Sequence, residues 1–191
     1  MPRLVDHEAR RAEIADAVWR VVRRDGIEGA SVRRVAAEAG CSTGSLRHYF
    51  STQSELVAFA MELVARRVGE RIAALRPQGP PVRRALAHLE EVVPLDDERR
   101  AEMHVWLAFT ARALVDPQLQ ELRDRAHADL RRLCAAVVRR LGVERDVAAE
   151  AERLHALVDG LAVHAVVDPA TTTPRRVRAL LRRHLEALAG G

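Results

Sequence analysis

The hydrophobic pattern of residues 31–50 predicts two short helices separated by a tight turn. In the first helix the apolar residues share one helical face, between Ser31, a natural N-cap, and Gly40, a natural helix stop. In the second helix, which Ser42 or Thr43 can cap, two large apolar side chains are expected to point inward. The apolar positions are Val32, Val35, Ala36 and Ala39 in the first helix, and Leu46 and Phe50 in the second.

The outward side of the second helix carries small, hydroxylated and basic residues. Small residues at its start let the backbone approach a nucleic-acid groove, and Arg47 suits guanine edges or phosphates. His48 and Tyr49 suit phosphates. The pattern therefore predicts a helix that reads DNA, with Thr43, Gly44, Ser45, Arg47, His48 and Tyr49 facing outward.

The rest of the chain has helical periodicity and no strand pattern, which predicts an all-α fold. The first helix is expected over residues 6–24, with a stop at Asp25-Gly26, and Ser51 is expected to cap a long linking helix that ends before residues 76–81. Further helices are expected over residues 82–93, from Asp96 or Asp97 onward, and from Asp116-Pro117 to Gly142.

Residues 146–168 form a predicted helix with apolar side chains on nearly all sides, which indicates burial on two sides. One side is expected to meet the chain's own core and the other a second subunit. The final helix, beginning at Thr173-Pro174, has one apolar stripe that the same partner would cover. Gly160 either permits close helix approach or is tolerated by packing. The predicted dimer interface contains Leu154, Leu157, Val158, Leu161, Ala162, Ala165, Val166, Val177, Leu181 and Leu185.

Composition and charge fit a folded protein with an anionic partner. The 191 residues are 48% hydrophobic and 30% charged, and 31 basic residues, all arginine, exceed 27 acidic ones for a net charge of +4. Cys41 and Cys134 lack metal-ligand spacing and fit a reducing compartment. No run reaches the ~20 apolar residues of a membrane span, and the N-terminus lacks the apolar core of a signal peptide. We therefore expect a cytoplasmic protein with no membrane partner.

The motif AxEAGCSTGSLRHYFSTQSEL, at residues 36–56, resembles the DNA-binding signature of the TetR family of transcriptional regulators. The resemblance implies a three-helix helix-turn-helix head, residues 1–50, and a helical body, residues 51–191, that binds an effector and dimerises. Family members commonly have Tyr in place of Arg47 and Lys in place of Gln53, a phosphate-contacting position. One charge is thus lost at the phosphate and one is gained nearer the groove. The expected DNA contacts are Ser31, Arg33, Ser42, Thr43, Gly44, Ser45, Arg47, His48, Tyr49 and Gln53.

The segment LHALVDGLAVHAVVDP, at residues 154–169, resembles the carboxy-terminal domain of one TetR branch, which includes regulators of choline and betaine metabolism. In that branch the last two helices of each subunit form a four-helix dimer interface. The apolar pattern of residues 146–168 indicates a dimer independently.

Residues suited to metal binding or catalysis do not converge in the sequence. His155 with Asp159, and His164 with Asp168, are each spaced to meet on one helical face, but such pairs are usually local hydrogen bonds, whereas a divalent site needs three or more ligands. No nucleophile setting or glycine-rich phosphate loop is present, and the adjacent Glu90-Glu91 point in different directions. We expect no catalytic residue, metal or cofactor, and a helical metal-binding protein or enzyme is the alternative.

Aromatic residues make up only 3% of the chain, so Trp106 and Phe109 are notable, and the resemblance implies that the effector pocket lies in this part of the body. The two side chains either fill the core or line that pocket. An apolar or amphipathic effector is favoured over a quaternary amine, because a cation needs a carboxylate and only Glu90 and Asp159 are available. The sequence thus predicts a homodimeric repressor that an effector of unknown identity releases from double-stranded operator DNA. A dimeric regulator without a ligand is the alternative. The candidate pocket residues are Glu90, Met103, His104, Trp106, Leu107, Phe109, Thr110 and Asp159.

Overall fold

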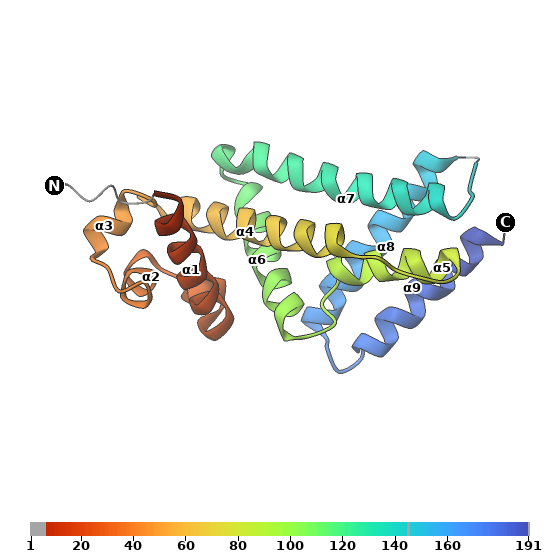
Figure 1. Cartoon of the computed structure of the whole chain (residues 1–191), viewed down its shortest axis with the longest axis horizontal. Helices are drawn as coiled ribbons and strands as arrows, with labels where there is room; N and C mark the ends of the chain where they lie inside the picture. The colour runs from red at the N-terminus through yellow and green to blue at the C-terminus, as the bar shows by residue number, and fades with distance from the viewer. Residues whose placement is uncertain (1–6, 145, 191) are drawn as a thin grey trace. The chain divides into compact units, whose positions relative to one another are not determined.

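The computed structural model describes residues 7–144 and 146–190, which form nine α-helices, two short 3₁₀ helices and no β-strand (Figure 1). The all-α prediction is confirmed for these residues. The helices are α1 (His7–Gly29), α2 (Val32–Glu38), α3 (Thr43–Arg47), α4 (Gln53–Ala74), α5 (Pro81–Leu89), η1 (Glu90–Val92), α6 (Asp97–Ala113), η2 (Pro117–Leu119), α7 (Gln120–Arg140), α8 (Val147–Val167) and α9 (Pro174–Ala189).

The chain divides into two compact units. The first contains the residues up to Val64 together with His104–Leu119, and the second contains Ala65–Met103 together with the residues from Gln120 onward. Two long helices, α4 and α6, therefore contribute one part to each unit.

An apolar core in the first unit holds α1, α2 and α3 together with the beginning of α4 (Figure 1). Gly26 interrupts α1 with φ 72° and ψ 169°, so the expected stop at Asp25-Gly26 is a kink, and helix resumes up to Gly29. The left-handed φ favours glycine there. Several side chains of this core are at most 3% exposed, among them Ile14, Val18, Val35, Leu46, Phe50 and Leu56.

Thr52 caps α4, one residue later than the sequence predicted. The Thr52 hydroxyl accepts a hydrogen bond from the Glu55 backbone N–H at 3.1 Å, while the Ser51 N–H and hydroxyl both donate to the Glu55 carboxylate. The Glu55 side chain thus reaches back across the helix start, as in a capping box. These bonds hold the pKa of the Glu55 carboxyl below its ordinary value.

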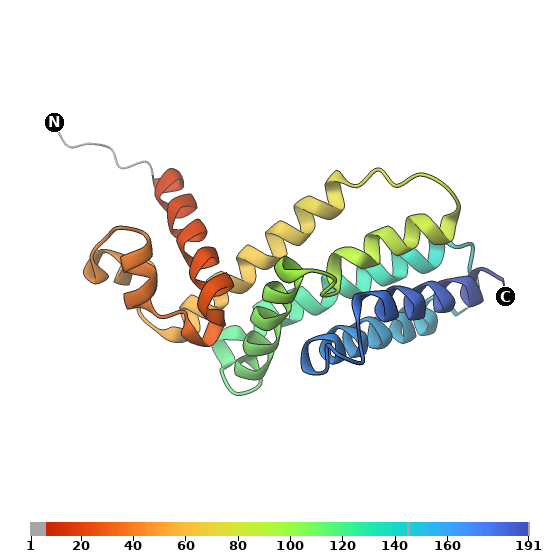
Figure 2. The same ribbon diagram turned by 90° about the horizontal axis from the view of Figure 1, so that it is seen from below.

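The second unit is a helical bundle in which α7 packs against α8 and α5 packs against α9 (Figures 1 and 2). The α5 helix ends at Leu89 and a 3₁₀ turn follows, so the predicted helix over residues 82–93 is too long at its end. The α9 helix starts where the sequence predicted, and Thr173 caps it, because the Thr173 hydroxyl accepts from the Arg176 N–H at 3.3 Å. Side chains that are at most 1% exposed in this core include Leu89, Leu154, Val158, Val177, Leu181 and Leu185.

A buried ion-pair network joins α4, η1 and α6 within the second unit. Arg71 donates to both Glu102 carboxylate oxygens at 2.7 Å and to Glu91 at 2.8 Å, and Arg99 also donates to Glu91 at 2.7 Å. Glu91 and Glu102 are only 8% and 5% exposed. Losing Arg71 would remove the guanidinium that donates both of these bonds to the buried Glu102 carboxylate, which is far more costly than losing an exposed pair, whereas Glu91 would keep its bond to Arg99.

Candidate nucleic-acid interface

The turn between α2 and α3 has the local geometry that the sequence predicted. The Ser31 hydroxyl accepts from the Arg34 N–H at 3.3 Å and caps α2. Gly40 takes a left-handed φ of 61° after the helix, and the Cys41 N–H donates to the Ala36 carbonyl at 3.0 Å. This combination closes the carboxyl end of α2 and turns the chain into α3.

The inward side of α3 is anchored by two side chains. Leu46 is completely buried and Phe50 is 3% exposed, with the Phe50 ring 4.9 Å from the Phe59 ring of α4. Ser42, rather than Thr43, caps α3, because the Ser42 hydroxyl accepts from the Ser45 N–H at 3.0 Å. The helix is therefore fixed on its inner face, and its outer face is left to solvent.

Most of the predicted DNA contacts lie on this outer face or beside it. Arg33, Ser42, Gly44, Ser45, Arg47 and His48 are exposed, while Ser31, Thr43, Tyr49 and Gln53 are half-buried. Gln53 has a role that the sequence did not indicate, since its side-chain amide donates to the Ala30 carbonyl at 2.8 Å. This bond ties the first residue of α4 to the segment that precedes α2.

Charge around the turn is divided between paired and available arginines. Arg20 and Arg24 both bind the Glu38 carboxylate, at 2.7 and 2.8 Å, and support α2 from α1. Among the residues that the structure describes, Arg33 and Arg47 form no ion pair, and both are exposed. Their positive charge is therefore available to phosphates or base edges.

A capped helix-turn-helix whose second helix is exposed, basic and rich in small residues defines a DNA-binding protein. Comparisons with known proteins agree with this class. Residues 14–60 match the family described as "Bacterial regulatory proteins, tetR family", and residues 81–190 match "BetI-type transcriptional repressor, C-terminal".

Individual relatives cover almost the whole chain. The HTH-type transcriptional regulator PksA of Bacillus subtilis (strain 168) is 43% identical, over 98% of this chain and 94% of PksA. A transcriptional regulator from Rhodococcus sp. Rha1 is 34% identical, with a TM-score of 0.81, over 94% of this chain and 96% of that one. A putative regulator from Saccharomonospora viridis, solved in complex with choline, is 25% identical, with a TM-score of 0.78, over 95% and 97% of the two chains.

The chain therefore belongs to the TetR family of bacterial transcriptional regulators, and its carboxy-terminal part is of the BetI type. Within the described residues, every helix is too short or too polar to cross a membrane.

The predicted effector-pocket residues are divided between the two units. In the first unit, the α6 rings of Trp106 and Phe109 lie 6.4 Å apart, and the hydroxyl of Thr110 is buried without a hydrogen-bond partner among the described residues. His104 is exposed and Leu107 half-buried, and Met103, which ends the second unit's part of α6, is 7% exposed. Glu90 and Asp159 belong to the second unit.

The two carboxylates considered for a cationic effector already have partners. Glu90 lies 3.2 Å from the Arg178 guanidinium of α9. Asp159 lies 3.2 Å from His155, and burial raises the pKa of its carboxyl, while the two imidazoles of His155 and His127 oppose that rise. Neither carboxylate is therefore an unpaired charge that could serve as the counter-charge of a quaternary amine.

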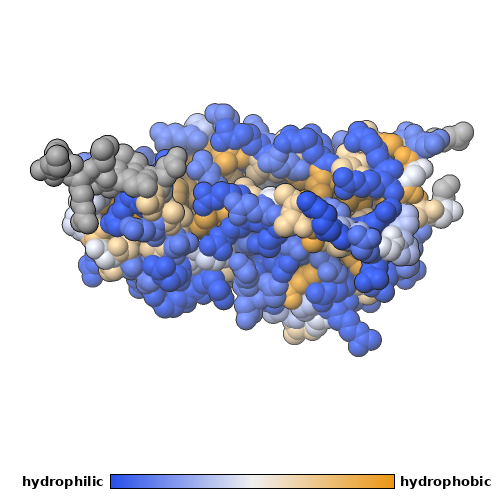
Figure 3. Space-filling model, viewed as in Figure 1, coloured by the Kyte–Doolittle hydropathy of each residue, from blue (hydrophilic) through white to orange (hydrophobic). Residues whose placement is uncertain are grey.

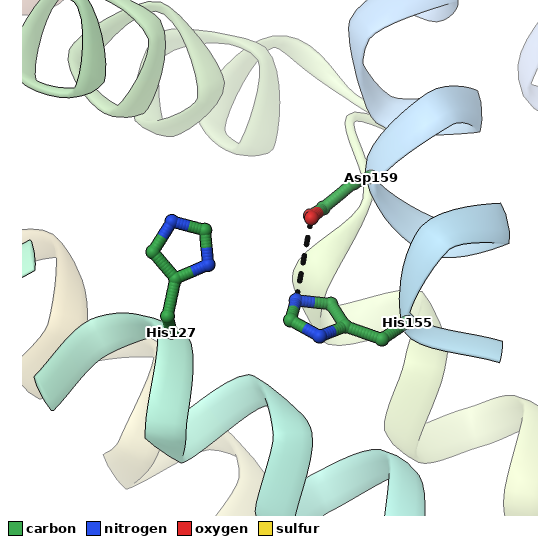
Figure 4. A group of neighbouring side chains, drawn as sticks. All are labelled: His127, His155 and Asp159. Carbon is green, nitrogen blue, oxygen red and sulfur yellow. Dashed lines mark ion pairs between the residues drawn. The ribbon is translucent and has the colours of Figure 1, made fainter. Parts of the chain in front are cut away.

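His127 joins His155 and Asp159 in a cluster that sequence spacing did not reveal. The three half-buried side chains point toward one another, His127 from α7 and the other two from α8 (Figure 4). Their ligand atoms all lie within 4.8 Å of one another. The i, i+4 spacing of His155 and Asp159 was visible in the sequence, but the approach of His127 depends on how α7 packs on α8.

A surface groove of about 440 Å³ lies elsewhere in the second unit. Arginine and histidine side chains line it, from the segment between α4 and α5, from α5 and from α7, with apolar residues between them. None of the predicted pocket residues contributes to it. Its lining is Leu75, Arg76, Pro77, Gln78, Pro81, Arg84, Ala85, His88, Val137 and Arg140.

Most residues of the predicted dimer interface are buried within the single chain. Leu154, Val158, Leu161, Ala162, Ala165, Val177, Leu181 and Leu185 are at most 8% exposed, whereas Leu157 and Val166 are half-buried. Another face of α8 leaves Ala156 and Gly160 exposed, and Val167 is 74% exposed. Apolar patches also interrupt the polar surface in the view of Figure 3. Any partner would meet these outward residues, because the inward set already fills the core.

Proposed function

We propose that this regulator is a homodimeric repressor that binds a palindromic operator through α3 and leaves it when a small molecule binds the body. The observation that carries the proposal is the exposed face of α3, with Arg47 available on it, in a chain whose body matches BetI-type repressors. A C2 dimer presents two such helices, so the operator halves should lie about 34–36 Å apart or a multiple of that distance.

The proposed DNA contacts fall into two groups. Arg47, Gly44, Ser45 and Thr43 on α3 would approach base edges, because they occupy the groove-facing side of the reading helix. Ser31, Arg33, Ser42, His48, Tyr49 and Gln53 would contact phosphates, with Gln53 exchanging or sharing its bond to Ala30.

The experiment that tests DNA binding uses the full chain and fragmented DNA from the source genome. Fragments that stay bound at rising salt are recovered and sequenced. We expect enrichment of a few sites with two inverted halves, because specific binding survives salt that removes the phosphate-driven background. The proposal would be contradicted if all fragments were recovered equally and if the binding of all of them declined in parallel as the salt concentration rises.

We propose that the effector contacts Trp106, Phe109 and Thr110 of α6 and is apolar or amphipathic. Two aromatic rings on the same helix as a hydroxyl that has no hydrogen-bond partner among the described residues suit a ligand with an apolar body and one polar group. The choline complex of the Saccharomonospora viridis relative makes a quaternary amine the competing class. The partners of Glu90 and Asp159 weigh against that class, since a buried cation needs its own counter-charge.

Tryptophan fluorescence distinguishes the two effector classes. The chain has two tryptophans, so Trp106→Phe leaves only the Trp19 signal of α1. An inducer that releases operator DNA should change the emission of the parent protein and leave that of Trp106→Phe unchanged. Choline and a series of neutral amphiphiles are titrated side by side. Release of DNA without any change at Trp106 would place the effector elsewhere.

The proposed dimer uses the outward face of α8, including Ala156, Gly160 and Val167, together with α9. Exposed apolar residues in a helical stripe favour coverage by a second copy.

Because both matched families are regulators, we also propose that the chain has no catalytic activity and acts in the cytoplasm, where it meets chromosomal DNA.

A further inference from the structure

We propose that His127, His155 and Asp159 form a binding site for a divalent transition-metal ion such as Zn²⁺. Zinc bonds to histidine nitrogen and carboxylate oxygen are about 2.0–2.2 Å long, so its tetrahedral ligand atoms lie about 3.3–3.6 Å apart. The ligand atoms of these three residues already lie within 4.8 Å of one another (Figure 4). Small side-chain rotations would therefore bring all three into contact with one ion.

The donor set points to a particular class of ion. Two imidazoles and one carboxylate suit Zn²⁺, Co²⁺ or Ni²⁺, whereas Ca²⁺ and Mg²⁺ prefer all-oxygen sites. Three protein ligands also leave a fourth position open for water or another small ligand. The sequence argued against a metal because it showed only paired ligands, and His127 supplies the third.

The frame of the site is rigid enough to hold an ion. His155 and Asp159 are one helical turn apart on α8, and His127 faces them from α7, which packs extensively on α8. An ion bound to all three would join the two helices. We therefore expect metal to stabilise the second unit as well as to bind it.

The surroundings of the His155 Nε2 atom also favour a bound metal ion. This atom is buried and lies 3.2 Å from the Asp159 carboxylate, in an orientation that does not make a hydrogen bond. A buried polar atom without a hydrogen bond is costly, and a metal ion would remove that cost. The ion would also offset the burial of the Asp159 carboxylate.

Cys134 lies near the cluster but is not assigned to it. Its sulfur is not among the ligand atoms that lie within 4.8 Å of one another, which come only from His127, His155 and Asp159. The site is therefore expected to have nitrogen and oxygen ligands only.

The test uses the full chain, stripped of metal with a chelator and then titrated with ZnCl₂ or CoCl₂. We expect one equivalent to bind, the melting temperature to rise, and the cobalt form to lack an intense thiolate charge-transfer band. His127→Asn and Asp159→Asn should each weaken zinc binding by about 100-fold or more, since losing even an outer-shell partner costs about 10–100-fold.

His164→Asn is the matched control. His164 and Asp168 repeat the i, i+4 spacing on α8, but no third ligand joins them in the described part of the chain. This variant should bind zinc as the parent does. Helix content measured by circular dichroism without metal verifies that each variant folds, and His127→Gln replaces His127→Asn if that variant does not.

Three results would overturn the assignment. The first is a parent protein that binds no stoichiometric zinc. The second is an equal loss of zinc affinity in His164→Asn and His127→Asn. The third is an intense thiolate band in the spectrum of the cobalt form, which would move the ion to a cysteine. Operator binding is measured in parallel on the metal-free protein, so failure of the metal site leaves the proposed repressor function separately testable.

Discussion

Arg47 is the residue on which sequence readout by α3 is expected to depend. Its guanidinium is exposed and forms no ion pair within the described residues. Arg47→Ala should weaken operator binding by about 5- to 150-fold, because a bidentate contact to a base contributes about 1–3 kcal/mol. Base preference at the contacted position should relax. Fluorescence anisotropy with operator and shuffled duplexes measures both effects.

Arg139→Ala provides the control for Arg47→Ala. Arg139 is an exposed arginine of α7, so its removal changes the net charge equally without touching the helix-turn-helix or the helices of the proposed dimer interface. Its operator affinity should stay close to that of the parent. Equal affinities for Arg47→Ala and the parent on both duplexes would show that α3 does not read the operator.

A substitution at Gly44 is expected to change operator affinity without lowering the stability of the fold. A Cβ atom added at Gly44 would meet only the Ser42 hydroxyl, at 3.8 Å, which is ordinary van der Waals contact. Gly44→Ala should therefore leave thermal stability unchanged or slightly higher, since alanine is the better helix former. Operator affinity should fall, because the added methyl group separates α3 from the groove. Paired thermal melts and anisotropy titrations test this; unchanged affinity would contradict a close approach at Gly44.

Local chemistry explains which residue roles the sequence could predict. Ser31 caps its helix as expected, Ser42 is one of the two caps considered for α3, and Thr173 stands at the predicted start of the last helix. These positions are predictable because a cap needs only a hydroxyl three residues before a free N–H. The role of Thr52 was missed because Ser51 beside it has the same chemistry, and only the position of Glu55 decides between them. The tether from Gln53 to Ala30 spans 23 residues, so no local pattern indicates it.

At the scale of elements, α2 depends on ion pairs with α1. Hydrogen bonds from Arg24 and Arg20 hold the pKa of the Glu38 carboxyl below its ordinary value of 4.5. A lowered pKa contributes stability that is fully present above 4.5 and is lost as the pH falls through the folded-state pKa.

Glu38→Gln should therefore make stability less dependent on pH in the acid range. The parent should lose stability as the pH falls below 4.5, and the variant should lose less over the same interval. Urea unfolding at a series of pH values measures the difference. The effect should be modest because the pair is exposed to solvent. Parallel curves for parent and variant would show that Glu38 does not contribute.

The α8 helix shows why the face of an element is harder to predict than its existence. Its apolar residues on nearly all sides indicated two buried sides, but the pattern alone did not say which side meets the chain's own core. Packing against α7 and α9 buries Leu154, Val158 and Leu161. The approach of His127 to α8 was unpredictable for the same reason, since it depends on the register between two helices.

At the scale of the whole molecule, the proposed dimer is tested by Gly160→Arg. A Cβ atom at Gly160 meets nothing within 4 Å, so the single chain has room for a larger side chain. A partner packed against α8 would not. We expect the variant to fold and to sediment as a monomer, whereas the parent sediments as a dimer.

Gly69→Arg is the matched control for Gly160→Arg. Gly69 also lies within a helix, on α4, and a Cβ atom there also meets nothing within 4 Å. The control should remain dimeric. A parent protein that is monomeric at micromolar concentration, or a dimeric Gly160→Arg, would remove α8 from the interface.

The bond from Arg112 Nε to the Ser54 hydroxyl, at 3.0 Å, has a practical consequence for hybrid regulators. Arg112 belongs to the stretch His104–Leu119, which falls in the same compact unit as α1, α2 and α3. If the amino-terminal segment with α1, α2 and α3 were transplanted alone to change DNA specificity, residues 104–119 would stay behind. Ser54 would then face the corresponding stretch of another protein instead of Arg112. Exchange of operator specificity between relatives should therefore succeed more often when two separated pieces of chain are moved together, with one crossover in α4 and two others flanking residues 104–119.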